Sequence, residues 1–434
     1  MTHPRLLIVG TVPYNTQSSS RAFDAYFHNW ERENIAQIFS DSISPVKGHC
    51  GTLFQITDYR LLQRWKGKSI ETGVIYNYDD LPDTNESTSR IDERKNMEMA
   101  YRFGAKHSPL THLLRAILWR KCLWCTHKLN KWLDDFNPEV VFLSFSDDFF
   151  ISQIALYVAQ RYNIPIVSSI GDDYIFNYRF SLNPLYNLYK YSYKRHITKV
   201  LGHQGSAIYI CDKIRDKYNM EFGLDGETVY LSSSIRRKDF SYINIENPLI
   251  TYFGNIRMGR NKALNDIGYA LGRINPQYKL EVYSGEKDPA IYNIFKDNPN
   301  IVYGGTIPYE QVQYKMASSD ITIIVEGFLA EDINWSRYSL STKAADSLAS
   351  GSMILSYGSQ ECGIIEYMQS TKASFVCTDR HQLEHVIRDM FINKSLQEQY
   401  YHQQIVITNK NHNLEKSCEV FENIVNRVLF KNKK

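Results

Sequence analysis

The stretch STKAADSLASGSMILSYG, residues 341–358, contains the pattern that decides the fold. Ser341 and Thr342 are good helix N-caps, so a short helix is expected to follow them, and Gly351 is a typical residue to end it. The apolar run at residues 353–356 then predicts a buried strand. A helix followed at once by a continuously apolar strand is typical of a parallel sheet that helices cover on both faces.

The same alternation runs through most of the 434 residues. In the first half, apolar runs predict strands at residues 5–9, 139–143, 164–168, 207–210 and 229–231. In the second half, they predict strands at residues 249–253, 280–283, 301–303, 321–325, 353–356 and 374–376, before a helical tail. The polar, irregular stretch 232–248 is interpreted as a linker. We therefore predict an α/β fold with two doubly wound, Rossmann-like domains that face each other across a cleft, at residues 1–240 and 241–434, the second carrying the C-terminal helices.

Composition excludes several classes of protein. Apolar residues make up 43% and charged residues 22% of the chain, which are globular values and rule out a disordered or collagen-like protein. The formal charge of +3 gives no indication of a nucleic-acid partner. The opening MTHPRLLIVG lacks the long apolar stretch of a signal peptide, and no uncharged apolar run approaches the ~18 residues that span a bilayer. We expect a cytoplasmic protein, with peripheral contact to the inner membrane face as an open possibility.

Cysteines give no sign of a metal or disulfide framework. The seven cysteines are odd in number and scattered, which favours reduced, mostly buried thiols. Cys122, Cys125 and His127 form a CxxCxH cluster, but one such cluster cannot supply the four ligands of a structural zinc site. We therefore favour plain packing over metal binding for these three residues.

Known nucleotide motifs are missing at the strand ends. The turn after the first strand, Gly10-Thr11-Val12-Pro13, and the turn after residue 253 both lack GxGxxG spacing, which excludes the usual nicotinamide site. The chain has no GxxxxGK[ST] loop, and no DxD flanked by apolar residues to anchor a diphosphate-bound metal. We predict neither a bound cofactor nor a metal.

The second half instead offers a phosphate site built from side-chain cations and a helix start. Arg257, Arg260 and Lys262 lie within nine residues of Gly254, which ends the first strand of that half. Ser341, Thr342 and Lys343 open the helix described above, whose N-terminus is electropositive. Asp346, one turn further on, has a carboxylate that can accept hydrogen bonds from ribose hydroxyls. A solvated basic turn and a helix-dipole partner are the simpler interpretations of these residues.

Three stretches resemble GT-B glycosyltransferases, most closely the retaining, metal-independent glycosyltransferase family four (glycosyl transferases group 1). YFGNIRMGRNK (252–262) is similar to the family's first-strand loop, and NPNIVYGGTIPYEQVQYKMASSDITIIV (298–325) to its base-reading segment. Residues 341–358 are similar to its Lys-x-x-Glu-x-x-Ala-x-Gly helix, with Asp346 at the glutamate position. The resemblance implies a nucleotide-diphosphate sugar as donor, with contacts at Gly254, Arg257, Arg260, Lys262, Ile307, Ser341, Thr342, Lys343 and Asp346.

The chain departs from the family pattern at the acid that touches the donor sugar. That acid usually lies eight positions before the ribose glutamate, where this chain has Tyr338. Glu326 resembles a displaced version of it, with an insertion between, and is a candidate catalytic residue. Lys262 is followed by Ala263 in place of the family's glycine.

The first half is expected to bind the acceptor. Gln17 and Arg21 lie in the polar loop after the first strand, and Asp147 and Asp148 follow the strand at 139–143; we predict that these four contact the acceptor. Asp172 and Asp173 follow the next strand and are candidate catalytic carboxylates that deprotonate or orient the acceptor hydroxyl. Helix capping or turn formation is the alternative for both pairs.

The function that we predict is sugar transfer to a glycan or lipid-linked acceptor in surface polysaccharide assembly, with retention implied by the resemblance. Cations and the helix start would stabilise the leaving diphosphate without a metal. A nucleotide-sugar epimerase and a non-catalytic GT-B-like binding or scaffold subunit remain alternatives.

Two basic, aromatic stretches, residues 110–133 and 186–199, indicate contact with anionic lipid. Packed helices with solvated basic faces are the alternative for both stretches.

Overall fold

The computed structural model describes residues 3–14, 21–83, 108–177 and 181–432. The chain divides into two compact units, Met1–Val229 with Cys418–Lys434, and Tyr230–Ser417. The expected boundary at residue 240 therefore moves to residue 229, and the last segment of the chain belongs with the first unit rather than the second. Among the described residues, no helix combines the length and the apolar composition needed to cross a membrane.

The first unit is built on an eight-stranded sheet with the order β4-β3-β2-β1-β5-β6-β7-β8. Neighbouring strands are parallel except for β4, which runs antiparallel to β3. The strands are β1 (Leu6–Gly10), β2 (Ile35–Phe39), β3 (Thr52–Ile56), β4 (Gly73–Asn77), β5 (Val140–Ser144), β6 (Ile166–Ile170), β7 (Gly205–Tyr209) and β8 (Glu227–Thr228). The sequence pattern did not predict β2, β3 and β4, and it placed the last strand two residues too late.

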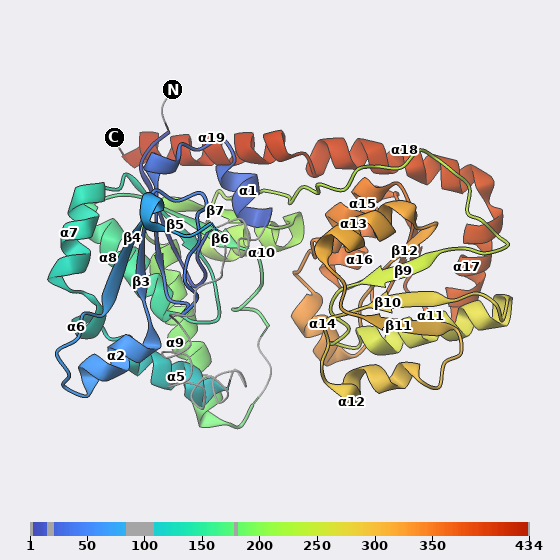
Figure 1. The fold of residues 1–434 in the computed structure, drawn as a ribbon, viewed down its shortest axis with the longest axis horizontal. Coiled ribbons are helices and arrows are strands. Elements are labelled where there is room, and N and C mark those ends of the chain that lie inside the picture. Colours follow the sequence, from blue (N-terminus) through green and yellow to red (C-terminus); the bar gives the residue numbers. More distant parts are fainter. Residues whose placement is uncertain (1–2, 15–20, 84–107, 178–180, 433–434) are drawn as a thin grey trace. The chain divides into compact units, whose positions relative to one another are not determined.

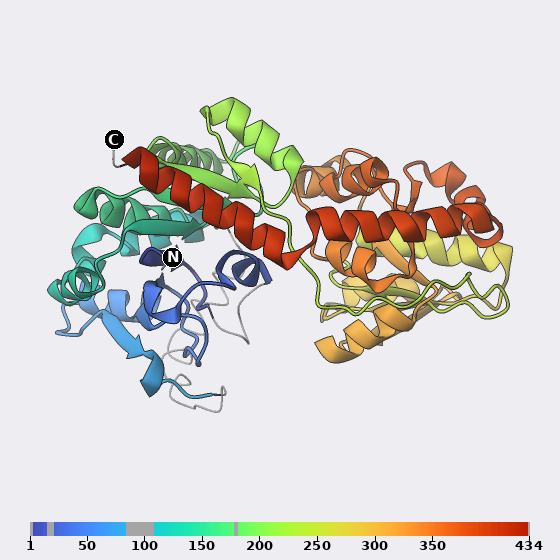
Figure 2. The same cartoon turned by 90° about the horizontal axis from the view of Figure 1, so that it is seen from above.

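Helices flank this sheet, as Figures 1 and 2 show. They are α1 (Arg21–Phe27), α2 (Asp58–Trp65), α5 (Pro109–Leu118), α6 (Lys121–Trp124), α7 (His127–Phe136), α8 (Phe150–Tyr162), α9 (Pro184–Leu201), α10 (Asp212–Phe222) and the C-terminal α19 (Leu414–Asn432). Short 3-10 turns lie at Arg32–Asn34 and Tyr78–Asp80. All seven cysteines have free thiols, and Cys122 is exposed while Cys125 is half-buried.

An aromatic cluster explains why α19 belongs to the first unit. Phe421 is fully buried, and its ring lies 5.2–5.7 Å from the rings of Tyr26, Phe27, Trp30 and Phe142. Ring pairs at such separations contribute beyond the apolar area that they bury. The prediction assigned the helical, charged tail to the second domain and overlooked this buried aromatic contact with the first unit.

We expect Phe421→Leu to destabilise the first unit by about 1–2 kcal/mol, because it removes four ring contacts but keeps most of the apolar volume. Thermal unfolding followed by circular dichroism measures the change. Phe430→Leu on the same helix is the matched control, since Phe430 is exposed and its loss should cost less than about 0.5 kcal/mol. Equal effects of the two substitutions would contradict this account of α19.

The second unit contains a six-stranded parallel sheet with the order β11-β10-β9-β12-β13-β14. Its strands are β9 (Ile250–Phe253), β10 (Leu280–Tyr283), β11 (Ile301–Gly305), β12 (Ile321–Val325), β13 (Met353–Tyr357) and β14 (Phe375–Cys377). Renumbered along the chain, this is the order 3-2-1-4-5-6 of a doubly wound Rossmann sheet. Here the apolar runs predicted all six strands to within two residues.

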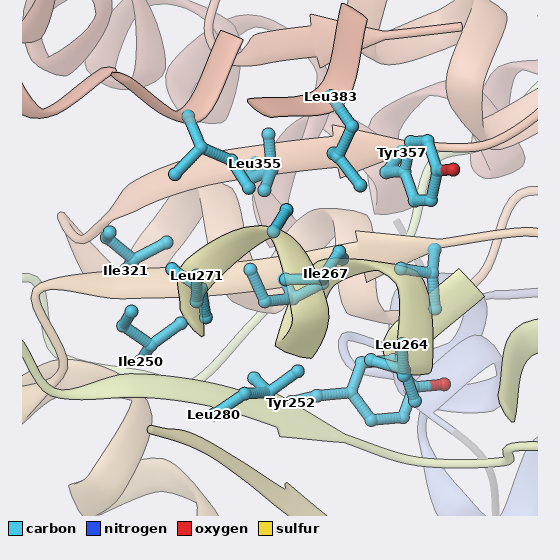
Figure 3. Close-up of a cluster of buried hydrophobic side chains, with 14 of the residues drawn as sticks. Ile250, Tyr252, Leu264, Ile267, Leu271, Leu280, Ile321, Leu355, Tyr357 and Leu383 are labelled. Atoms are coloured by element: carbon cyan, nitrogen blue, oxygen red, sulfur yellow. The ribbon is translucent and has the colours of Figure 1, made fainter. Parts of the chain in front are cut away.

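Helices cover both faces of the second sheet (Figure 1). They are α11 (Arg260–Ile274), α12 (Pro289–Tyr292), α13 (Tyr309–Ser318), α14 (Ala330–Ser336), α15 (Lys343–Ser350), α16 (Gly363–Thr371), α17 (Leu383–Ile392) and α18 (Lys394–Asn411), with 3-10 turns at Asn293–Phe295 and Arg380–Gln382. Figure 3 shows Leu264, Ile267 and Leu271 of α11 in one buried cluster with the strands. Their spacing places all three on one face of the helix. This buried face holds α11 against the sheet and so fixes the position of Arg260, its first residue, near the carboxyl end of β9.

Candidate active site

The topology of the second sheet predicts a ligand site at the carboxyl ends of β9 and β12. The chain leaves β9 towards β10 on one side and leaves β12 towards β13 on the other, so the winding direction changes between these two neighbours. They pair only through Ile250 with Ile321 and Thr251 with Thr322, and their carboxyl halves carry no ladder between them. Ligands of doubly wound sheets bind at this kind of switch point.

Arg260 and Glu326 meet at this switch point. Arg260 is the first residue of α11, and Glu326 is the first residue after β12. The Arg260 guanidinium donates from Nε to Glu326 Oε2 (3.0 Å) and from Nη2 to Oε1 (2.9 Å), and the two side chains are 9% and 2% exposed. Both carboxylate oxygens of Glu326 are thus occupied by the guanidinium, whose Nη1 makes neither of these bonds.

Lys343 joins the pair from the start of α15. Its ammonium donates to the hydroxyl of Tyr252 on β9 (3.1 Å), and that hydroxyl donates to the carbonyl of Asn255 (2.5 Å). Burial lowers the pKa of Lys343 to about 7; the positive charge of Arg260 adds to this effect and Glu326 opposes it. At neutral pH the ammonium therefore titrates, and an anion bound beside it would hold its proton.

Glycines keep the space around these groups open. Gly254 has φ +125°, and a Cβ there would lie 3.3 Å from Lys343 Nζ. Gly259 has φ +73°, and a Cβ there would fall 2.3 Å from Oδ2 of Asp332 on α14. That oxygen is buried without a hydrogen-bond partner among the described residues, and burial raises the pKa of Asp332. Lys262 and Arg260 lie close enough to Asp332 to oppose that rise.

An apolar patch lies beside the end of β9. Ile307 packs against a buried cluster that includes Phe253, Met316 and Ala349, so the structure places this predicted donor residue next to the last residue of β9. The ring of Phe253 stacks on that of Tyr283 with a centroid separation of 5.3 Å. Apolar and aromatic side chains beside cationic groups match the chemistry of a nucleotide base with its phosphates.

The start of α15 is organised by main-chain and side-chain contacts. Ser341 Oγ accepts from the Lys343 amide (3.3 Å), whereas Thr342 makes no capping bond with its side chain. Asp346, one turn along, is buried, and its Oδ1 accepts from the hydroxyl of Ser233 (2.6 Å). The carboxylate predicted to bind ribose is therefore already hydrogen-bonded to a hydroxyl of the segment after β8.

Two predicted donor residues lie apart from the Arg260 pair. Arg257 is 52% exposed and donates to both carboxylate oxygens of Glu286 (2.6 and 2.8 Å), with Asp288 at 4.0 Å. Lys262 is exposed on α11, and its charge acts on Asp332. Of the basic residues expected around a diphosphate, the structure thus brings together Arg260 and Lys343, next to Gly254.

In the first unit, the corresponding sheet edge holds a polar cavity of about 460 Å³. Its lining includes Thr11 after β1, Asp41 after β2, Asp58 at the start of α2, and Asp147 and Asp148 after β5. The predicted acceptor pair therefore lines a real cavity. Cavities of this size accommodate small ligands.

Arg115 and His112 of α5 contact the carboxylates of that edge. Arg115 ion-pairs with both Asp148 and Asp58, and His112 Nδ1 lies 3.1 Å from Asp148 Oδ1. Burial would raise the pKa of Asp148, but His112 and Arg115 together lower it. His112 Nε2 is also 3.6 Å from Asp147 Oδ2. His112, Asp147 and Asp148 form the one group of the described residues that could hold a metal ion. The guanidinium on Asp148 already supplies the positive charge that an ion would bring.

The second aspartate pair divides between two roles. Asp173 Oδ1 accepts hydrogen bonds from the amides of Ile175 and Phe176 (3.0 and 2.9 Å) and from the hydroxyl of Tyr218 (2.9 Å). The two amide contacts are those of a turn-forming aspartate, the alternative role given for this pair above. Asp172 is exposed at the same sheet edge. Gln17 lies outside the described residues, and Arg21 is described only as the first residue of α1.

No family model matches the chain, and no curated protein matches it. Solved structures do. Sucrose-phosphate synthase from Thermosynechococcus elongatus has a TM-score of 0.58 at 10% identity, covering 98% of this chain and 99% of its own. HepE from Anabaena, in complex with UDP, has a TM-score of 0.60 at 10% identity, covering 98% and 100%. The UDP-forming α,α-trehalose-phosphate synthase from Burkholderia xenovorans, with glucose-6-phosphate, has a TM-score of 0.57 at 10% identity, covering 98% and 99%.

The fold is GT-B. The predicted fold class is confirmed, with two doubly wound units in one chain. Sequence reasoning missed Tyr252, Ser233, His112, Arg115 and Asp332 as members of these sites. Two of these left a signal in the sequence: Tyr252 opens the stretch 252–262 that resembles the family's first-strand loop, and Asp332 is an acid in the first turn of a helix soon after Glu326.

Proposed function

We propose that the protein is a glycosyltransferase that moves a sugar from a nucleotide-diphosphate sugar to a glycan or lipid-linked acceptor, in surface polysaccharide biosynthesis. The observation that carries this proposal is the convergence of Arg260 and Lys343 at the switch point of a GT-B fold. HepE, which has the same fold, has been solved with UDP and with UDP-glucose. We propose transfer with retention of configuration and without a metal or cofactor.

On the donor side, the chemistry is stabilisation of the leaving group. Negative charge builds on the diphosphate as the glycosidic bond breaks, and donors preorganised in a pocket that excludes water stabilise it most. Arg260 would bind a phosphate oxygen through Nη1, and Lys343 would supply a second positive charge. Glu326 would then act as a positioning residue that orients the guanidinium, whereas the family resemblance predicts a catalytic role for it.

The same donor would extend along the β9 end of the sheet. The base would lie against the apolar patch of Phe253 and Ile307, and the ribose hydroxyls would compete with Ser233 for Asp346. On the acceptor side, Asp148 is held by Arg115 and His112, and the side chain of its neighbour Asp147 is 33% exposed, against 9% for Asp148. Asp147 and Asp172 would orient or deprotonate the acceptor hydroxyl.

The first test is ligand binding by the full chain. We expect UDP, GDP or ADP to raise the melting temperature in the presence of EDTA, because a ligand that binds only the folded state stabilises it by about 2.7 kcal/mol at 100 times its Kd. Arg257→Ala should leave most of this shift in place, since Arg257 is committed to Glu286. If Arg257→Ala abolished the rise in melting temperature, the diphosphate would bind at Arg257, in the loop that the sequence analysis predicted.

Two further outcomes separate the alternatives. Conversion of a nucleotide sugar without any acceptor would identify an epimerase. Tight nucleotide binding with no transfer to any glycan or lipid-linked acceptor, and no release of nucleotide diphosphate, would identify a binding or scaffold subunit. Nuclear magnetic resonance of the product's anomeric proton decides between retention and inversion.

A further inference from the structure

Helix α5 of the first unit carries exposed apolar side chains. Leu110, Leu114 and Ile117 are 41%, 54% and 48% exposed. Their spacing of four and three residues places them in one stripe along the helix. The opposite side of α5 faces inward, where Arg115 and His112 reach the carboxylates described above. The stripe is therefore the outward face of a helix that is firmly anchored.

Helix α9 continues this surface. It packs against α5, as Figure 1 also shows, and carries Leu185, Leu188 and Tyr191 at intervals of three residues, all exposed. Leu182, two residues before the helix, is 87% exposed. These seven residues, Leu110, Leu114, Ile117, Leu182, Leu185, Leu188 and Tyr191, are called the α5–α9 surface. Soluble surfaces rarely gather so many large apolar side chains on two adjacent helices.

The charged side chains of the two segments that carry this surface have one sign. Residues 108–133 and 181–204 contain no aspartate or glutamate. Lys194 and Arg195 of α9 are exposed and have no carboxylate partner among the described residues. Both line a cavity of about 480 Å³ together with Tyr191 and Lys190, whose ammonium donates to Tyr174 O (2.8 Å) and Asn177 Oδ1 (2.6 Å). The apolar stripe therefore borders a basic hollow.

We propose that the α5–α9 surface docks the protein on an anionic lipid bilayer. The leucines would enter the interface between head groups and acyl chains, and Lys194 and Arg195 would contact lipid phosphates. A second copy of the chain fits less well, because a two-fold contact would set cations against cations without an acid between them. Docking does not depend on the proposed transfer activity, so each can fail without the other.

The test is co-sedimentation of the full chain with vesicles at low salt. We expect binding to vesicles that contain phosphatidylglycerol and little binding to pure phosphatidylcholine. Lys194→Gln with Arg195→Gln should weaken binding about 30-fold, at the usual contribution of a basic residue near an anionic membrane. Leu114→Gln with Leu188→Gln should weaken it at least about tenfold, because it removes apolar area from the interface. The matched controls are Lys410→Gln and Ile392→Gln, both exposed in the second unit.

Each other outcome overturns the proposal. Absence of binding to phosphatidylglycerol vesicles, or equal losses in the control variants, would remove the lipid as the occupant. A concentration-dependent dimer in light scattering that Leu114→Gln with Leu188→Gln converts to monomer would assign the surface to a second copy. Circular dichroism of each variant establishes that the chain is folded before binding is compared.

Discussion

Arg260→Ala should lower the melting temperature of the second unit by about 6–20 °C and abolish donor binding. The substitution leaves Glu326, 2% exposed, without the guanidinium that binds both of its carboxylate oxygens, and breaking a buried ion pair from one side typically costs about 3–5 kcal/mol. For a unit of this size, each kcal/mol lowers the melting temperature by about 2–4 °C. Differential scanning calorimetry measures the stability, and isothermal titration with a nucleotide sugar measures binding.

A double variant separates stability from function at this pair. Arg260→Met with Glu326→Leu replaces both charges by apolar groups of similar volume, a change that is often neutral or stabilising. We expect its melting temperature to return close to that of the unsubstituted protein, while donor binding stays absent because no guanidinium remains.

Arg273→Ala is the matched control for this pair. Arg273 lies on the same helix, is 59% exposed and pairs with Glu384, so its loss should change stability by less than about 1 kcal/mol. The argument fails if Arg260→Ala costs no more stability than Arg273→Ala. It also fails if the double variant still binds the donor as the unsubstituted protein does.

The fold of the second unit could be predicted because each of its strands is a separate apolar run with polar residues on either side. In the first unit, β2 and β3 are interrupted by Gln37 and Gln55, both buried. Gln37 hydrogen-bonds Val12 O and the Tyr14 amide, and Gln55 bonds Asp41 O. These hydrogen bonds to distant parts of the chain allow both glutamine side chains to be buried in strands. In the sequence alone, a polar residue at such a position indicates a loop.

The candidate site could be predicted in part, for a related reason. Position after the first strand of the second half identified Gly254 and Arg260, and position at a helix start, together with the family resemblance, identified Lys343. Side-chain direction could not be predicted: Arg257 and Arg260 are three residues apart, yet Arg257 is 52% exposed and pairs with Glu286, whereas Arg260 is buried and pairs with Glu326. The left-handed turn at Gly259 separates them, and local sequence does not determine which acid each arginine finds.

Lys343→Met should lower the rate of sugar transfer by about 10²–10³-fold, the usual cost of removing one preorganised donor to a developing charge. It should also remove a pH dependence. Burial holds the pKa of Lys343 to about 7 in the free protein, with Arg260 adding to the depression. A diphosphate beside the ammonium favours the charged form and raises that pKa, so donor binding takes up a proton above neutral pH.

The sign of this linkage fixes the expected profile. Because the complex binds more protons than the free protein, affinity falls as pH rises above about 7, by up to about tenfold per pH unit, until the pKa of the complex is reached. A nucleotide sugar is the proper ligand, since it lacks the terminal phosphate whose ionisation near pH 6 would overlap. Calorimetry in two buffers of different ionisation enthalpy counts the protons taken up.

Substitutions at Lys343 identify the titrating group. Lys343→Met should bind weakly with a flat profile, and Lys343→Arg should flatten the profile while keeping a positive charge at every pH, because arginine does not titrate in this range. Tyr252, Arg260 and Glu326 face the same ammonium and remain in all variants, so a slope that survives in Lys343→Met would show that the proton does not go to Lys343. Lys410→Met, an exposed lysine of the same unit, should behave like the unsubstituted protein. Only a group at the donor's own position can show both the loss of rate and the loss of slope, so the two measurements together place the diphosphate beside Lys343.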